Sequence, residues 1–196
     1  KGGVYVVMEA KTDLKGEELQ KAMEQTQAVI EERVNQMGLA EPVVTIEGDK
    51  RIRVELPGAE DAQEAIEQIG KTAQLQFALA DGTIVLDGGS VKDASVTTDQ
   101  DSAGYAVALE FDSKGADAFY EATVKAYSGA VQSSVEGVNN DAIMILLDNQ
   151  IISAPSVNKG PISGGKCTIT GNFSQEEASN LTALIKGGAL PLTLEE

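Results

Sequence analysis

The chain has 196 residues, 42% of them hydrophobic, and a net charge of −16 from 15 basic and 31 acidic residues. Its length suits one large domain or two small ones, and so acidic a surface repels the phosphates of nucleic acids and of anionic lipids. The sequence contains no histidine, which excludes Ser-His-Asp and Cys-His catalysis and histidine-ligated zinc. Its single cysteine, Cys167, has no partner for an internal disulfide, and no stretch reaches the roughly 18 apolar residues of a membrane span.

Hydrophobic periodicity in the first 80 residues predicts strands and helices in the order β-α-β-β-α-β. Asp13 offers an N-cap to a long helix that ends before Gly38, and Gly48 and Asp49 form a compact turn between two alternating strands. This element order is typical of the ferredoxin-like, or split βαβ, unit. The expected elements are a strand at 4–10, a helix at 19–37, hairpin strands at 44–46 and 52–56, a helix at 62–69 and a strand at 75–79.

The second half of the chain predicts the order β-α-β-β-β-α-β. The segment DGTIVLDGGS, residues 81–90, is expected to form two turns. Asp112 or Ser113 caps one helix, and Ser174 forms a capping box with Glu177 at the start of the last helix. A weaker strand at 91–98 is expected before this series. The elements of the series are a strand at 105–111, a helix at 116–127, strands at 142–147, 150–155 and 167–171, a helix at 178–185 and a strand at 189–196.

These patterns predict an α+β fold with mainly antiparallel sheets. It consists of a ferredoxin-like βαββαβ base lobe at residues 1–82 and a second α+β head lobe at residues 83–172. Residues 173–196 form a C-terminal helix and strand.

Local motifs do not indicate catalysis. The loop GPISGGKC contains Gly160, Gly165 and Lys166 and is similar to a phosphate-binding loop, with Cys167 in place of the usual Ser or Thr. The residues after Lys166 alternate as a strand, whereas a phosphate-binding loop leads into a helix, so we expect no nucleotide cofactor. Asp99 and Asp101 could contribute to a calcium site, but their surroundings lack the ligand number of an EF-hand, and a solvated acidic loop is the favoured interpretation. Cys167 is expected to be a small core residue.

Several longer stretches resemble the SecD family. RVNQMGLAEPVVTIEGDKRIRVELPG, residues 33–58, is similar to the family's Arg-Val-Asn-x-x-Gly run, its Glu-Pro step, its Gly-x-x-Arg-Ile turn and its Leu-Pro-Gly end. The segment 146–196 resembles SecD in its Gly-Asn-Phe and Gly-Ala-Leu-Pro landmarks, and KGGVYVVMEA resembles the strand that follows the family's first membrane helix. The residues that carry this resemblance are Arg33, Asn35, Gly38, Glu41, Pro42, Pro57, Gly58, Gly171, Asn172, Phe173, Gly188, Ala189, Leu190 and Pro191.

The resemblance implies an extracytoplasmic domain of a subunit that works with SecF and the SecYEG translocon. Such a domain lies between the first two membrane helices, and ion flow through the membrane part is expected to drive its movement, which assists the translocation and release of an unfolded preprotein. The resemblance implies no enzyme activity, no metal and no cofactor. The middle segment, 105–140, is shorter than in many members and indicates a Gram-positive source, in which the domain is extracellular. The alternative is a ligand-binding ectodomain of a transporter of the resistance-nodulation-division superfamily.

If membrane helices flank the chain, both of its ends return to the membrane, and the strand at 189–194 is expected to lie beside the first lobe. The chain would then pass between base and head at two glycine-rich segments, which can absorb backbone rotation at low steric cost. These glycines could equally be ordinary turns in a rigid block. The hinge candidates are Gly82, Gly88, Gly89, Gly160, Gly164 and Gly165.

Overall fold

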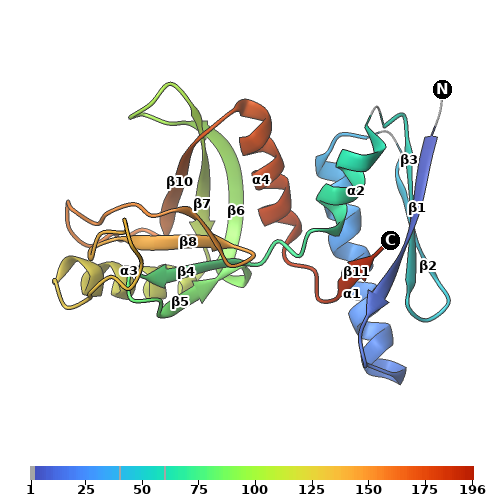
Figure 1. Cartoon of the computed structure of the whole chain (residues 1–196), viewed down its shortest axis with the longest axis horizontal. Coiled ribbons are helices and arrows are strands. Elements are labelled where there is room, and N and C mark those ends of the chain that lie inside the picture. The colour runs from blue at the N-terminus through green and yellow to red at the C-terminus, as the bar shows by residue number, and fades with distance from the viewer. Residues whose placement is uncertain (1–2, 40, 60) are drawn as a thin grey trace. The chain divides into compact units, whose positions relative to one another are not determined.

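The chain folds into two compact units in a computed structural model that describes residues 3–39, 41–59 and 61–196. Unit 1 contains residues 1–73 and 186–196, and unit 2 contains residues 74–185. The chain therefore leaves unit 1 once, after Ala73, and returns to it once, at Lys186 (Figure 1). The predicted ranges 1–82, 83–172 and 173–196 place the divisions at other residues.

Unit 1 is a four-stranded antiparallel sheet with two helices, and its strand order is β11-β1-β3-β2. β1 pairs with β3 along most of its length, from Gly3 opposite Pro57 to Glu9 opposite Arg51. The unit has the β-α-β-β-α-β arrangement of a ferredoxin-like fold, which confirms the predicted fold class. Its elements are β1 (Gly3–Lys11), α1 (Gly16–Gln36), β2 (Val43–Glu47), β3 (Arg51–Pro57), α2 (Ala62–Gly70) and β11 (Thr193–Glu195).

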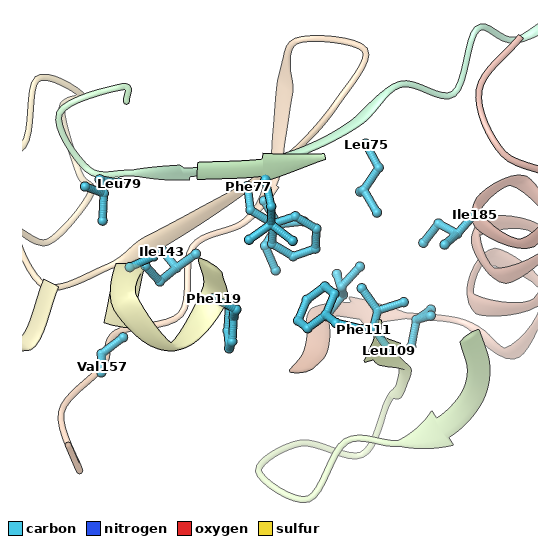
Figure 2. Packing of buried hydrophobic residues seen from close by; sticks show 14 of the residues in the cluster. Leu75, Phe77, Leu79, Leu109, Phe111, Phe119, Ile143, Val157 and Ile185 are labelled. Carbon is cyan, nitrogen blue, oxygen red and sulfur yellow. The ribbon is translucent and has the colours of Figure 1, made fainter. Parts of the chain in front are cut away.

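Unit 2 contains two antiparallel sheets, with strand orders β5-β4-β8-β9 and β10-β7-β6, and the helices α3 and α4. Its core brings together the rings of Phe77, Phe111 and Phe119, whose centroids lie 5.3, 6.3 and 5.1 Å apart (Figure 2). Its elements are β4 (Leu75–Leu79), β5 (Ile84–Asp87), the short 3-10 helix η1 (Gly88–Ser90), β6 (Val91–Thr98), β7 (Tyr105–Phe111), α3 (Ser113–Tyr127), β8 (Ile143–Leu147), β9 (Gln150–Ser153), β10 (Lys166–Phe173) and α4 (Gln175–Gly187).

The last strand of the unit 1 sheet is β11, and not the strand predicted at 75–79. β11 pairs antiparallel with the end of β1, with Glu9 opposite Glu195, which confirms the predicted place of the C-terminal strand beside the first lobe. Its predicted extent was too long, because residues 189–192 lie outside β11. The strand at 75–79 forms as β4, but it pairs with β5 and β8. Leu75 and Phe77 are buried in the core of unit 2. Alternation of apolar residues identifies a strand and its buried face, but it does not identify the neighbouring strand.

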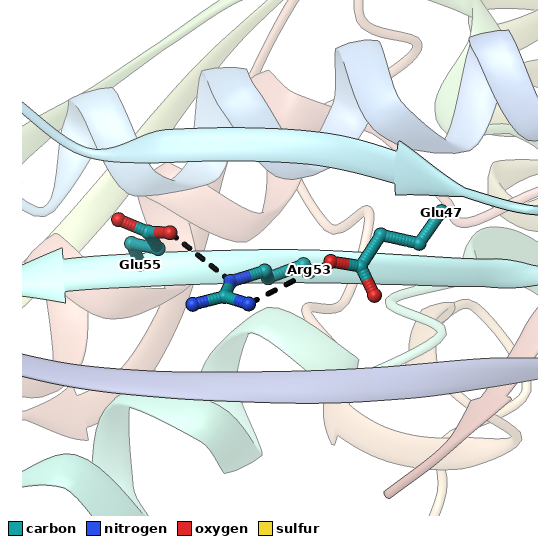
Figure 3. A network of polar contacts seen from close by, with 3 residues as sticks. All are labelled: Glu47, Arg53 and Glu55. Carbon is teal, nitrogen blue, oxygen red and sulfur yellow. Dashed lines mark hydrogen bonds and ion pairs between the residues drawn. The ribbon is translucent and has the colours of Figure 1, made fainter.

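The two faces of the unit 1 sheet differ in character. On one face β1 buries every second residue, from Val6 to Ala10, in a core that includes residues of both helices. On the other face Arg53 lies between Glu47 and Glu55, at 3.7 and 3.0 Å (Figure 3). Its guanidinium also lies over the ring of Tyr5. The charged side chains of this network are more than a third exposed, and exposed ion pairs contribute less than about 1 kcal/mol. Burial of the apolar face therefore holds unit 1 together.

Local capping predictions in unit 2 are confirmed. The carboxylate of Asp112 caps α3 by accepting a hydrogen bond from the N–H of Gly115 at 2.7 Å. Ser174 and Glu177 form the predicted capping box, because each side chain accepts from the backbone N–H of the other, at 2.9 and 3.1 Å. These bonds fix where α3 and α4 begin.

Two other local predictions are wrong. α1 begins at Gly16, with Lys15 as an N-cap that makes no side-chain cap bond, so Asp13 lies too early to reach the first N–H groups of the helix. The segment 84–87, predicted as part of two turns, forms β5 and pairs with β4. Four residues are too few to show a reliable period, and only the pairing with β4 makes them a strand.

Ser174→Ala is expected to lower the free energy of unfolding of unit 2 by about 1 kcal/mol, because the N–H of Glu177 loses its acceptor. Ser174→Asp keeps a hydrogen-bond acceptor at the same place, so its free energy of unfolding should stay close to that of the wild type. Urea denaturation followed by circular dichroism measures both variants. An equal loss in both would contradict the role of the cap.

Candidate functional site

The described part of the chain holds no evident metal centre. Within residues 3–39, 41–59 and 61–196, no three Cys, Asp or Glu side chains gather closely enough to hold a metal ion. In the same residues, no helix combines the length and the apolar character that crossing a membrane requires.

The glycine-rich loop before Lys166 leads into a strand. β10 begins at Lys166, which confirms that a strand and not a helix follows this loop. A phosphate-binding loop relies on the N–H groups at the start of a helix, and the residues after Lys166 do not provide them.

The acidic loop at Asp99 is organised by its own hydrogen bonds. The Asp99 carboxylate accepts from the N–H of Asp101 at 3.0 Å and from the hydroxyl of Ser102 at 2.8 Å. The bond from the Asp101 backbone, followed by that from Ser102, lowers the pKa of Asp99. Its oxygens therefore shape an exposed turn.

Cys167 lines a cavity of about 210 Å³ in unit 2, together with Phe119, Ile143 and Val157. Its side chain is half-buried and packs against the core of unit 2, as predicted for a small apolar residue. Burial raises the pKa of Cys167 to about 12, so the thiol is protonated at neutral pH. A protonated thiol is a poor nucleophile, and this one has the surroundings of a structural cysteine.

Cys167 should therefore resist alkylation in the folded chain. The rise of its pKa from 9.0 to about 12 reduces the thiolate fraction at pH 8 by roughly 1000-fold, and the reaction rate with a maleimide should fall in parallel. The expected result is slow labelling without denaturant and rapid labelling in urea. Rapid labelling of the folded chain would contradict the half-buried, protonated thiol.

The six hinge candidates all lie inside unit 2, away from the two places where the chain passes between the units. Their role as hinges stays a prediction. Gly165 has a packing reason to be glycine, because its φ is +68° and an added Cβ would lie 3.0 Å from the Cβ of Ala116. The others lie in the β4–β5 turn (Gly82), in η1 (Gly88, Gly89) and in the loop between β9 and β10 (Gly160, Gly164).

Most residues of the family signature lie at or near the end of a helix or strand. The backbone carbonyl of Asn35 accepts a hydrogen bond from the N–H of Gly38 at 3.1 Å at the end of α1, and Pro57 ends β3 opposite Gly3. The ring of Phe173 occupies the space where a Cβ on Gly171 would lie. Pro42 is half-buried directly before β2, whereas Ala189 and Pro191 are exposed. The signature residues with left-handed backbone are Gly38, Glu41, Gly58, Asn172 and Gly188.

Two signature residues from distant parts of the sequence meet in unit 1. Arg33 of α1 is only 2% exposed, and its guanidinium donates to four backbone carbonyls. Nη2 donates to Gly188 at 2.8 Å, which joins residues 155 positions apart in the chain. The other acceptors are Ile69 at 2.7 Å, Lys71, and Thr72 at 3.4 Å.

These acceptors lie where the chain leaves unit 1 and where it re-enters it. The N–H of Leu190 also donates to the carbonyl of Thr72 at 2.9 Å, so the outgoing and returning segments are bonded to each other. We call Arg33, residues 69–73 and residues 186–190 the junction. The junction holds the two backbone segments in place through these hydrogen bonds.

Sequence reasoning identified Arg33, Gly188 and Leu190 as signature residues but gave them no role. It missed Thr72 and Gly187. The glycine pair at the end of α4 was a usable signal, but Thr72 takes part through its carbonyl, which every residue has.

Two family models match the chain. One describes the SecDF P1 head subdomain and covers residues 60–192, and the other describes the N-terminal part of the P1 domain of protein translocase subunit SecDF and covers residues 23–82.

Curated relatives described as protein translocase subunit SecD match nearly the whole chain. Protein translocase subunit SecD of Leptotrichia buccalis is 38% identical over 100% of this chain and 45% of that protein. Protein translocase subunit SecD of Acidaminococcus fermentans is 37% identical over 99% of this chain and 43% of that protein. The chain thus spans less than half the length of these relatives.

Solved structures agree with the sequence matches. SecDF in a super-membrane-facing form superposes with a TM-score of 0.80 at 28% identity, over 99% of this chain and 29% of the other. A structure described as a membrane component, SecDF, that enhances protein export superposes with a TM-score of 0.77 at 29% identity, over 98% of this chain and 97% of the other.

Proposed function

This chain belongs to the SecD family of protein translocase subunits, whose P1 domain it matches, and from that membership we propose that it assists the translocation and release of an unfolded preprotein. The proposed place is the extracytoplasmic side of the cell membrane, which is the outside of the cell if the source is Gram-positive. The proposed partners are SecF, the SecYEG translocon and the preprotein. Ion flow through the membrane helices of the complete subunit would move the domain, which acts without catalysis and without a cofactor.

The observation that carries the proposal is the insertion of unit 2 into unit 1 through two segments that lie side by side. Thr72 and Leu190 are hydrogen-bonded to each other, and the nearby residues Ala73 and Gly188 have left-handed backbone, at φ 52° and 80°. A unit attached in this way can rotate as one body, because a few residues at element ends absorb the change in backbone angles. We therefore propose the junction as the moving joint, in preference to the six glycines inside unit 2.

A second candidate is a ligand-binding ectodomain of a resistance-nodulation-division transporter. The cavity beside Cys167 favours it, because Phe119, Ile143 and Val157 give it apolar walls. Its volume of about 210 Å³ is below the roughly 300–1,000 Å³ of typical small-molecule sites, so this candidate ranks second.

Crosslinking to a stalled preprotein tests the proposed function. In full-length SecD carrying Cys167→Ala, one new cysteine is placed on each unit, by Gln25→Cys in unit 1 and by Ser128→Cys in unit 2; both positions are exposed. A preprotein arrested in the translocon should crosslink to at least one of these positions.

The matched control is the same preprotein released from the channel and folded, which should give no crosslink. If neither position, nor other exposed positions on either unit, captures the arrested chain while SecYEG itself does, the proposed contact with the preprotein is wrong.

A further inference from the structure

The C-terminal end of α2 has no basic residue in its own last turn. The end of a helix carries partial negative charge, and its last carbonyls need donors from elsewhere. Arg33 of α1 provides both a positive charge and the donors, since its Nη1 donates to the carbonyls of Ile69, at 2.7 Å, and of Lys71. A residue 36 positions earlier in the chain therefore caps α2.

The same guanidinium reaches the residue that follows α4. Its Nη2 donates to the carbonyl of Gly188 at 2.8 Å. The side chain passes so close to the end of this helix that a Cβ on Gly187 would lie 2.7 Å from the Cγ of Arg33. Glycine at position 187 thus leaves the space that the arginine occupies.

The geometry of this contact requires arginine. A guanidinium presents five N–H donors in a rigid planar fork, whereas the ammonium of lysine has three donors on one nitrogen at the end of a flexible stem. Only the fork can span the carbonyls of two separate segments, 69–72 and 188. The 2% exposure of Arg33 shields these bonds from competing water.

The two segments that Arg33 holds are the connections to unit 2. The chain leaves unit 1 a few residues after the end of α2 and re-enters it at the end of α4. We propose that Arg33 is the positioning residue that makes the two connections a single joint, by binding the C-terminal ends of both helices with one guanidinium. The inference rests on the proposed function in one respect, namely that the joint serves translocation through a change in the relative orientation of the units.

Amide hydrogen exchange on the 196-residue chain, measured by NMR, tests the inference. In Arg33→Lys the exchange rate of the Leu190 amide, which donates to Thr72, should rise by about tenfold or more, because this bond opens once the joint loosens. Amides at the centre of β3 and of β8 should keep their wild-type rates. The matched control is Arg53→Lys, a half-exposed arginine of the same unit, which should leave Leu190 unchanged.

A second variant keeps the test decisive if Arg33→Lys does not fold. Gly187→Ala retains the guanidinium but pushes against its stem, and it should raise the Leu190 exchange rate in the same way. Gly3→Ala is its control, because Gly3 lies in unit 1 outside the junction, an added Cβ there would make only ordinary contacts, the nearest at 3.5 Å from the Cα of Pro57, and the backbone angle is ordinary.

Wild-type protection of Leu190 in both Arg33→Lys and Gly187→Ala would overturn the inference. So would equal loosening of the centres of β3 and β8, because Arg33 would then be a general core residue. The crosslinking test of the proposed function uses subunits with Arg33 intact. Its failure would therefore be distinguishable from failure of the joint.

Discussion

Phe77→Ala is expected to lower the free energy of unfolding of unit 2 by about 3–5 kcal/mol, the range for a fully buried phenylalanine. Phe77 is 0% exposed, and its ring meets those of Phe111 and Phe119 edge-on at centroid distances of 5.3 and 6.3 Å. Removing it leaves a cavity between β4, β7 and α3 and breaks two favourable aromatic contacts. Amide hydrogen exchange distinguishes an effect on unit 2 from an effect on unit 1, since amides of β7 and β8 should lose protection while those of β3 keep it.

Tyr127→Ala is the matched control for this prediction. Tyr127 is an aromatic residue of α3 in the same unit, but it is 53% exposed, and its removal should cost less than about 0.5 kcal/mol. If Phe77→Ala destabilised β3 as much as β7, the separation of the chain into two cores would be wrong.

Leu192→Ala should destabilise unit 1 instead, by about 2–5 kcal/mol. Leu192 lies almost at the end of the chain, yet it is 7% exposed and belongs to the core formed by β1, α1 and β3. Its loss opens that core directly beside β11. Amides of β1 and β3 should therefore exchange faster, while those of β7 and β8 should not.

Thr193→Ala, at the neighbouring exposed position, should change little and serves as the control. Destabilisation of unit 2 by Leu192→Ala, with unit 1 intact, would show that the C-terminal segment packs in the core of unit 2 and not in that of unit 1.

Local features of this fold were predictable because their causes are local. The capping box at Ser174 and Glu177 and the cap at Asp112 depend on residues three positions apart, and the structure contains both. β5 was not predictable, because its four residues form a strand only through their pairing with β4. The strand at 75–79 was found, but its alternation could not distinguish the sheet of unit 1 from that of unit 2.

The junction could not be predicted from the sequence for the same reason, because it depends on long-range contacts. The sequence contains Arg33, Gly188 and Leu190 as parts of a family signature, but their contacts join segments far apart in the chain, with 155 positions between Arg33 and Gly188. The predicted hinges followed from glycine content, which identifies flexible backbone but not where the chain passes between units. That place depends on the pairing of β11 with β1, a long-range contact.

The most direct measurement is single-molecule FRET on full-length SecD in a membrane, with dyes at Gln25→Cys and Ser128→Cys in a Cys167→Ala background. The control pair, Ser95→Cys with Ser128→Cys, lies entirely within unit 2. If the two units change their relative orientation as they handle a preprotein, arrest of a preprotein in the translocon should shift the first distribution and leave the control distribution in place. If the FRET distribution of the Gln25→Cys and Ser128→Cys pair is identical with and without the arrested preprotein, the units do not change their relative orientation during translocation, and the proposed joint is wrong.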